Sequence, residues 1–158
     1  MDTIAKEVID LLRKKRLTLG TVESATGGLI AHLLTTVPGA SDVFRGSIVA
    51  YSNGVKAGVV GVKAADIQQY GAVSPQVARQ MAAGGRRLLG VDVCVADTGI
   101  AGPGGATPGK PVGLFYLGIS HAGGTYARKH IFTGDREYNA HAAAEAALEW
   151  VREWANRI

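Results

Sequence analysis

Apolar residues along this chain repeat with two different spacings, and each spacing predicts its own kind of element. Ile4, Val8, Leu11 and Leu12 recur every three or four positions, which predicts an amphipathic helix over residues 2–16. Similar patterns predict further helices at residues 29–37, 54–60, 63–69, 74–89 and from 135 onward. Short runs of apolar and β-branched residues instead predict strands at residues 17–22, 44–51, 92–96, 112–120 and 125–132.

Polar and glycine-containing segments mark where these elements begin and turn. Ser74-Pro75 is typical of a helix start, with serine as N-cap and proline at the first helical position, and Asp135 is expected to open the last helix. The connection 121–124 predicts that the last two strands form an antiparallel hairpin. Because helices and strands alternate, we expect an α/β fold, a three-layer α/β/α sandwich around one mixed, mostly parallel sheet of about five strands.

Composition narrows the class of protein further. The chain has 158 residues, which fits a single domain over residues 1–158. Glycine accounts for 22 of them, about twice its usual share of roughly 7%. The absence of a Gly-X-Y period and a hydrophobic content of 47% exclude collagen and disorder. A loop-rich enzyme or binding domain fits these numbers.

Charge and cysteine content point to an intracellular protein that does not bind nucleic acid directly. The net charge is +4, from 17 basic and 13 acidic residues. The densest basic run, 13–16, ends the first predicted helix, where cations favour the helix dipole. Cys94 is the only cysteine and lies in an apolar run, so we expect a buried thiol without a disulfide. The chain has no long apolar run and no signal-peptide core, so we expect a cytoplasmic protein without membrane contact.

The first candidate site is the segment 23–28, Glu-Ser-Ala-Thr-Gly-Gly, which follows a predicted strand and precedes a predicted helix. Ligands of open α/β sheets bind at the carboxyl ends of strands, where Ser24 would project its hydroxyl and free N–H groups could hold an anion. The structural alternative is an ordinary N-cap, in which Ser24 or Thr26 satisfies the first amides of the helix. Spacing alone leaves both readings open.

A second candidate follows the next strand, in Tyr51-Ser52-Asn53-Gly54-Val55-Lys56. A lysine in a partly desolvated pocket has a lowered pKa and can serve as a general base. The alternative is a solvated lysine beside an Asn-Gly turn.

The third candidate is the long loop 98–113, which contains six glycines and three prolines and again follows a strand. Long loops in compact domains are usually functional, although a mobile surface loop is the alternative. Its N–H groups could wrap a ligand, with Lys110 available to an anion. None of the four histidines has metal-site spacing or a place beside Ser24, so we expect no metal and no Ser-His-Asp triad.

Eight short motifs occur in one order along nearly the whole chain, and together they resemble the CinA C-terminal domain family of nicotinamide-nucleotide amidohydrolases. They are Glu-Ser-x-Thr-Gly-Gly at 23–28, Pro-Gly-Ala-Ser at 38–41, Phe-Arg-Gly at 44–46, Ala-Tyr-Ser-Asn at 50–53 with Lys56, Gly-Ala-Val-Ser at 71–74, Thr-Gly-Ile-Ala-Gly-Pro-Gly-Gly at 98–105, Lys-Pro-Val-Gly at 110–113 and Phe-x-Gly-Asp-Arg at 132–136. We expect no counterpart here of the domain that precedes this one in two-domain relatives.

The resemblance implies hydrolysis of the nicotinamide mononucleotide amide to nicotinic acid mononucleotide and ammonia, without metal or other cofactor. It makes Ser24 the nucleophile, Lys56 its general base and Tyr51 an assistant that orients the lysine or relays a proton. Amides near Thr26, Gly27 and Gly28 would form the oxyanion hole. Ribose and phosphate would be held by residues from several loops: Ser41, Arg45, Asn53, Thr98, Gly99, Gly102, Lys110 and Arg136. We also expect Glu23 to position Lys56 or a substrate hydroxyl.

Two departures from the family pattern qualify that expectation. Ala25 stands where the family commonly has cysteine, and Ala140 or His141 stands where relatives usually carry a further arginine. Alternatives to the amidohydrolase are therefore a catalytically weak nucleotide-binding module and a competence or DNA-damage accessory protein. The expected partners are a small nucleotide substrate and further copies of the chain.

Overall fold

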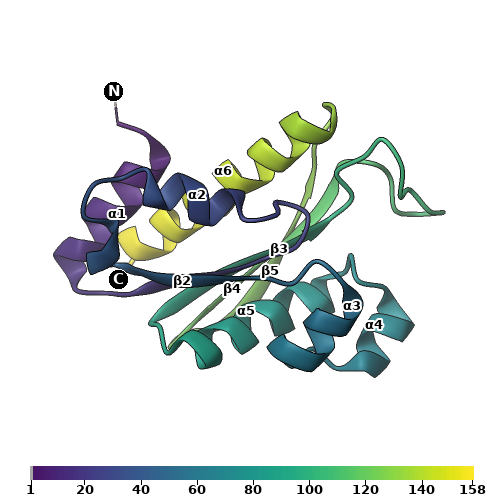
Figure 1. The fold of residues 1–158 in the computed structure, drawn as a ribbon, viewed down its shortest axis with the longest axis horizontal. Helices are drawn as coiled ribbons and strands as arrows, with labels where there is room; N and C mark the ends of the chain where they lie inside the picture. The colour runs from purple at the N-terminus through teal and green to yellow at the C-terminus, as the bar shows by residue number, and fades with distance from the viewer. Residues whose placement is uncertain (1) are drawn as a thin grey trace.

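The computed structural model describes residues 2–158 and has three layers, with helices on both faces of one sheet (Figure 1). One face carries α1 (Ile4–Lys15), α2 (Leu29–Thr35) and α6 (Arg136–Asn156). The opposite face carries α3 (Asn53–Val55), a π-helical turn (Lys56–Val60), α4 (Ala64–Tyr70) and α5 (Pro75–Leu89). This is the α/β/α sandwich that the alternating pattern predicts.

The sheet has five strands in the order β2-β1-β3-β4-β5. They are β1 (Leu19–Glu23), β2 (Phe44–Val49), β3 (Val93–Gly99), β4 (Leu114–His121) and β5 (Gly124–Ile131). The strands β2, β1 and β3 run parallel, whereas β4 and β5 pair antiparallel, so the sheet is mixed. The predicted hairpin is confirmed, with His121 opposite Gly124 at its turn.

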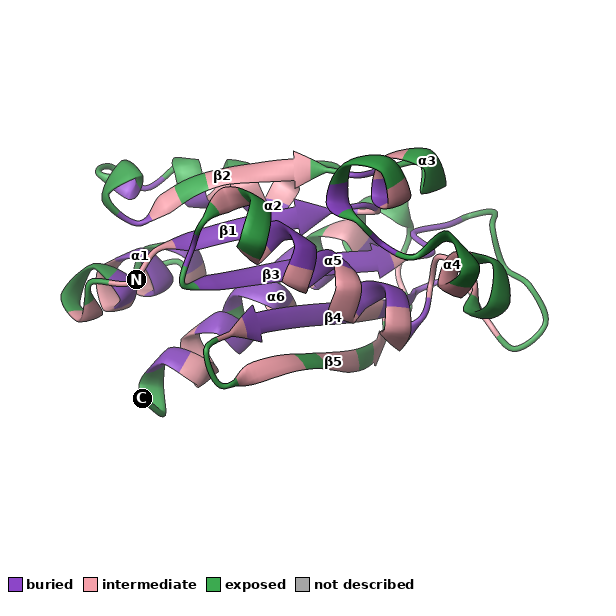
Figure 2. Cartoon of the chain, turned by 90° about the horizontal axis from the view of Figure 1, so that it is seen from below, coloured by how far each residue is buried: buried purple, intermediate pink, exposed green. Residues whose placement is uncertain are grey.

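Alternation along the central strands divides the core into two halves. Val93 and Val95 of β3 pack toward α1, α2 and α6, whereas Cys94 and Ala96 pack toward α5. The central strands β1, β3 and β4 are mostly buried and the edge strands β2 and β5 are more exposed (Figure 2). The prediction that the Cys94 thiol is buried is confirmed.

Helix α5 lies unusually close to the sheet because it carries Gly84 and Gly85. A Cβ at Gly85 would come within 2.2 Å of Val22 Cγ2 and 2.7 Å of Cys94 Sγ, and one at Gly84 within 2.2 Å of the Val60 carbonyl oxygen. Only a residue without a side chain fits either position, which explains two glycines inside a helix despite their cost in helix propensity.

Most boundaries agree with the sequence patterns, and the differences have local causes. Thr3 caps α1 by accepting the Lys6 amide, so the helix begins at Ile4 rather than at residue 2. The predicted strand at 92–96 continues to Gly99 because β4 pairs with it that far. No helix among residues 2–158 is long and apolar enough to cross a membrane.

Candidate active site

The carboxyl ends of the three parallel strands meet at one edge of the sheet, and a cleft of about 230 Å³ lies there. It collects segments that are far apart in the sequence, from the ends of β1, β2 and β3, the turn before α5, the long loop and the start of α6. Its lining residues are Ser24, Ala25, Tyr51, Asn53, Lys56, Ala72, Val73, Thr98, Gly99, Ile100, Ala101, Gly102, Gly104, Gly105 and Arg136.

Ser24 and Lys56 are in direct contact at the floor of this cleft. Lys56 Nζ lies 2.9 Å from Ser24 Oγ and donates a hydrogen bond of 3.0 Å to the Tyr51 carbonyl. Both side chains are nearly buried, with 7% of Ser24 and 2% of Lys56 exposed. The alternative of a solvated surface lysine is therefore excluded.

Burial also tunes this lysine. Desolvation lowers the pKa of Lys56 below its ordinary value, and the carboxyl group of Asp97 opposes that shift. A neutral amine has a lone pair that can accept the Ser24 proton while one N–H still bonds Tyr51. The pair has the geometry and the electrostatics of a nucleophile with its general base.

The local sequence after β2 explains how Lys56 reaches Ser24. Ser52 accepts the Val55 amide and starts the short helix α3, and the chain then widens into the π turn at Lys56. Such wide turns are rare and are frequent at functional sites. The sequence pattern predicts a helix over 54–60 but contains no signal for the change of helix type.

Ser24 is not the cap of helix α2, and neither is Thr26. Gly28 occupies the N-cap position without a side-chain bond, and Glu23 caps the helix instead by accepting the Ile30 and Ala31 amides at 2.8 and 2.9 Å. The expectation that Glu23 positions Lys56 or substrate is wrong, because its buried carboxylate is occupied by these amides and by neighbouring hydroxyls. Because the Ser24 hydroxyl does not cap α2, it is available to Lys56.

Asp97, which sequence reasoning missed, is the residue that holds the Ser24 segment. Its carboxyl group accepts the Ser24 amide at 3.2 Å and the Thr26 amide at 3.1 Å, and it contacts the Thr26 hydroxyl. Asp97 is fully buried, and burial raises its pKa to about 6. Its one available signal was a carboxylate in an otherwise apolar strand, close to that strand's carboxyl end.

The predicted oxyanion donors need correction. The Thr26 amide bonds Asp97 and the Gly27 amide bonds the Ser24 carbonyl, and neither Thr26, Gly27 nor Gly28 lines the cleft. Ala25 does line the cleft, and no acceptor for its amide occurs within residues 2–158. The residue after the nucleophile is a common oxyanion donor in hydrolases of other folds.

Arg136 and Tyr51 meet across the mouth of the cleft. The Arg136 guanidinium donates to the Gly102 carbonyl at 2.8 Å and to the Tyr51 hydroxyl at 3.1 Å. The contact between Tyr51 and Lys56 is made by the Tyr51 backbone carbonyl. The exposed side chain of Tyr51 lies beside Arg136 instead. Asn53 also lines the cleft, and Arg136 is the one cation besides Lys56 among the described lining residues.

Thr98 and Gly99, at the end of β3, line the cleft as predicted. The Thr98 hydroxyl donates to the Ala72 carbonyl at 2.8 Å and so fixes the turn before α5. A Cβ at Gly99 would lie 2.3 Å from the Phe115 ring, so this residue must be glycine for β4 to pair beside the site. Further along the loop, the amides of Ala101, Gly102, Gly104 and Gly105 lack acceptors within residues 2–158 and are available to a ligand.

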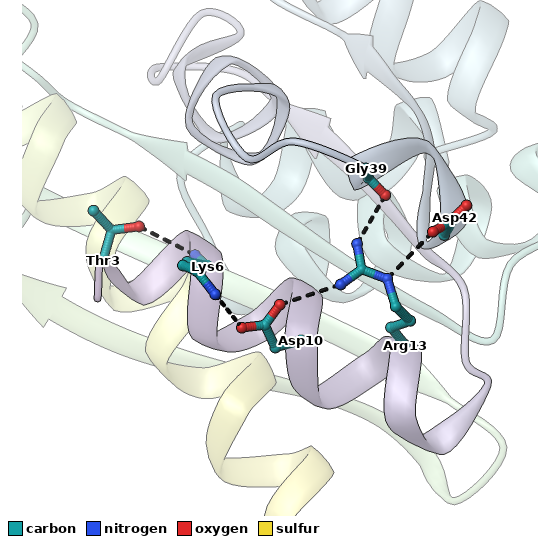
Figure 3. A network of polar contacts seen from close by, with 6 residues as sticks. All are labelled: Thr3, Lys6, Asp10, Arg13, Gly39 and Asp42. Atoms are coloured by element: carbon teal, nitrogen blue, oxygen red, sulfur yellow. Dashed lines mark hydrogen bonds and ion pairs between the residues drawn. The ribbon is translucent and has the colours of Figure 1, made fainter. Parts of the chain in front are cut away.

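Ser41 and Arg45 were predicted to bind substrate and lie elsewhere. They flank the amino end of β2, where Phe44 pairs with Leu19 at the start of β1, so they occupy the opposite edge of the sheet from Ser24. Arg45 donates to the Ser41 carbonyl at 2.6 Å. Their segment is held by α1, since Arg13 bonds Gly39 and Asp42 in the network of Figure 3. Within one copy of the chain, this Pro-Gly-Ala-Ser motif thus contacts α1 and does not line the cleft.

Lys110 was also predicted to bind substrate, and it too lies outside the cleft. Its ammonium donates to the Tyr70 carbonyl at 2.5 Å and ties the long loop to the end of α4, outside the residues that line the cleft. Ala140 and His141, at which the family resemblance implies a further arginine, are also absent from the lining. Ala140 lies one helical turn after Arg136.

None of the four histidines lines the cleft: His32 and His141 are exposed, and His121 and His130 stack on aromatic rings. His121 stacks on Trp154 with ring centroids 4.8 Å apart, and Trp150 is buried beneath Arg128. Within residues 2–158, no three His, Cys, Asp or Glu side chains come together as a metal-binding group.

Comparison with known proteins gives consistent matches over almost the whole chain. A family model described as the CinA C-terminal domain matches residues 1–155. A CinA-like protein of Salinibacter ruber is 52% identical over 143 residues, covering 90% of this chain and 35% of that protein. A CinA-like protein of Rippkaea orientalis is 46% identical, covering 96% of this chain and 37% of that protein. The chain thus spans about a third of the length of these curated relatives.

Solved structures agree with the fold. A CinA-superfamily protein from Klebsiella pneumoniae superposes with a TM-score of 0.95 at 28% identity, covering 98% of this chain and 97% of that one. A competence/damage-inducible protein from Agrobacterium tumefaciens gives 0.93 at 36% identity, with 97% and 93% covered.

Proposed function

The chain belongs to the CinA C-terminal domain family, and on that premise we propose that it is an amidohydrolase that converts nicotinamide mononucleotide to nicotinic acid mononucleotide and ammonia. The observation that carries the proposal is the buried contact of 2.9 Å between Lys56 Nζ and Ser24 Oγ on the floor of the cleft. A binding module has no need of a buried, desolvated amine against a serine hydroxyl. Acyl transfer from an amide needs a nucleophile with a base beside it, and this pair supplies both.

In the proposed reaction, Ser24 Oγ attacks the carboxamide carbon while neutral Lys56 takes the hydroxyl proton. The Ala25 amide receives the developing oxyanion. Collapse of the tetrahedral intermediate breaks the C–N bond, Lys56 returns the proton to the leaving nitrogen, and ammonia departs. An ester remains on Ser24.

Hydrolysis of that ester uses the same groups in reverse order. Lys56 takes a proton from water, and the resulting hydroxide attacks the ester carbon. The second tetrahedral intermediate expels Ser24 Oγ, which regains its proton from Lys56 as the nicotinic acid mononucleotide leaves.

The rest of the cleft suits the nucleotide part of this substrate. Loop amides at Ala101, Gly102, Gly104 and Gly105 offer uncharged donors, and Arg136 supplies a cation for a phosphate. The phosphate group would extend toward the mouth, where Arg136 lies.

Incubation of the purified protein with nicotinamide mononucleotide, with ammonia as the readout, tests the proposal. Ser24→Ala should abolish turnover, and Lys56→Ala should reduce kcat by about 10²–10⁴-fold. Ser41→Ala is the matched control, because Ser41 lies at the opposite edge of the sheet, and it should retain wild-type activity.

Two results would point elsewhere. Full activity in Ser24→Ala would contradict the assignment of Ser24 as the nucleophile. Failure to release ammonia from any of several pyridine nucleotide amides would contradict the proposed reaction. In the second case, calorimetric titration with the same nucleotides distinguishes a non-catalytic nucleotide-binding module from a protein that does not bind them. A DNA mobility shift at physiological salt would instead favour the accessory-protein alternative.

A further inference from the structure

Two buried carboxyl groups lie on either side of the Thr26 hydroxyl. Thr26 Oγ1 is 2.7 Å from Glu23 Oε1 and also contacts Asp97 Oδ2. A hydroxyl has one proton and can donate only one hydrogen bond. Both contacts are hydrogen bonds only when one of the two carboxyl groups itself carries a proton and donates it to Thr26.

The donors around each group indicate which one is protonated. Glu23 accepts four further bonds, from the Ile30 and Ala31 amides and from the Thr21 and Ser47 hydroxyls. A proton on Glu23 would have to displace one of these donors, so the geometry leaves Glu23 as the acceptor of the Thr26 hydroxyl. Asp97 accepts only two amides, that of Thr26 at Oδ1 and that of Ser24 at Oδ2. Oδ2 also faces Thr26 Oγ1, so a proton on Oδ2 can be donated to Thr26 while the same oxygen still accepts the Ser24 amide.

The same carboxyl group acts electrostatically on Lys56. Two charged or titratable groups face Asp97 among residues 2–158: Glu23 from β1, whose charge opposes ionisation of Asp97, and Lys56 from the π turn. An ionised Asp97 favours the charged amine, which cannot act as a base. A protonated Asp97 leaves Lys56 with desolvation alone, which favours the neutral amine.

We propose that Asp97 is a positioning residue of the Ser24–Lys56 pair, which in the active form holds a proton, donates it to Thr26 and leaves Lys56 without an anionic partner. Its two accepted amide bonds fix the backbone of the nucleophile, and its neutral state keeps the base neutral. The kinetic part of this inference rests on the proposed amidohydrolase function. The protonation of Asp97 does not depend on it.

Asn is an uncharged substitute for the protonated acid that keeps part of its bonding. A nitrogen at the place of Oδ2 can donate to the Thr26 hydroxyl and Oδ1 can still accept the Thr26 amide, whereas the Ser24 amide loses its acceptor. Asp97→Ala removes both functions and should reduce kcat about 10²-fold with little change in KM. Asp97→Asn should restore part of that loss, because it keeps the Thr26 bonds and lacks only the acceptor for the Ser24 amide. It should also move the acid limb of the kcat/KM profile to lower pH by about 1 unit, because the ionised fraction of Asp97, which favours the charged amine of Lys56, is removed.

The exposed acid Asp2, before α1, provides the matched control as Asp2→Asn, which should leave the pH profile in place. A profile for Asp97→Asn that coincides with wild type would overturn the electrostatic role. Wild-type kcat in Asp97→Ala would overturn the positioning role.

Carbon-13 NMR of side-chain carboxyl groups tests the protonation without any substrate. The wild-type spectrum should contain one resonance that is missing from Asp97→Asn and titrates near pH 6, well above an ordinary aspartate. A midpoint near 4 for that resonance would refute the proton on Asp97 whether or not the protein hydrolyses nicotinamide mononucleotide. A midpoint near 6 without turnover would leave the carboxyl assignment standing and remove only the proposed reaction.

Discussion

At the scale of single residues, burial of the Lys56 amine beneath the cleft has a cost in folding free energy. A buried amine is unfavourable in its charged form, which is why the pKa of Lys56 is lowered. Its two polar partners, Ser24 and the Tyr51 carbonyl, compensate only in part. Groups placed for chemistry commonly reduce stability in this way.

Replacement of this lysine by methionine should therefore stabilise the fold while abolishing activity. For Lys56→Met we expect a gain of about 1 kcal/mol in the free energy of unfolding near neutral pH, measured by urea denaturation. The unfolded wild-type chain binds more protons than the folded one between the lowered pKa of Lys56 and its ordinary value. Wild-type stability should rise with pH through that window, and the gap to Lys56→Met should narrow. A gap that widens with pH would contradict this account.

Arg136 and Arg45 form a second residue-scale test, because both were predicted to bind substrate and only Arg136 lines the cleft. Arg136→Ala should raise KM for the mononucleotide about tenfold, through loss of a charge-assisted hydrogen bond to phosphate. Arg45→Ala should leave KM unchanged. The nucleoside that lacks the phosphate should be insensitive to both changes in steady-state kinetics.

Some residues of the candidate site could be predicted from the sequence and others could not. Ser24 and Lys56 could be found because each follows an apolar strand, and strand ends of a parallel sheet converge. Asp97 could not, because a strand pattern does not reveal which inward position meets a neighbouring loop. The position of Ser41 and Arg45 at the amino end of β2 could not be predicted either, because the order of motifs does not say at which end of the strands a loop lies.

At the scale of elements, helix caps and short turns could be predicted closely, whereas distances between elements could not. Ser74 and Asp135 cap α5 and α6 as their side chains suggested. The sequence does not show which elements pack against the two glycines inside α5. In the structure, α5 approaches β1, β3 and the π turn at these positions.

Gly85→Ala tests that close approach. The added methyl group would overlap Val22 and Cys94, and we expect a loss of about 1–3 kcal/mol in the free energy of unfolding. Gly58→Ala is the control, since a Cβ at Gly58 meets nothing within 4 Å. Equal stability of the two variants in urea denaturation would contradict tight packing of α5.

At the scale of the whole molecule, the fold class and the layer order follow from the alternation of elements along the chain. Strand order does not follow from it, because β1 could neighbour β2, β3 or both. The sheet edges matter for association, as β2 and β5 have one unpaired side and expose Val49 and Ile131. Exposed edge strands with apolar side chains favour pairing with another chain.

Self-association is accordingly the prediction at this scale. Light scattering on a size-exclusion column should give a mass above the 16.4 kDa of one chain. Ile131→Lys should weaken the assembly if β5 forms the contact, and Val49→Lys should weaken it if β2 does. A single species of monomer mass over a wide concentration range would contradict it.

The positions of the two chain ends have a practical consequence. The segment before α1 and the C-terminal end of α6 lie on the side of the molecule away from the arrowheads of β1, β2 and β3 (Figure 2). An affinity tag or a surface linker attached at either terminus would leave the cleft facing solvent. Immobilised protein should therefore be suitable for following nucleotide capture and release by surface plasmon resonance.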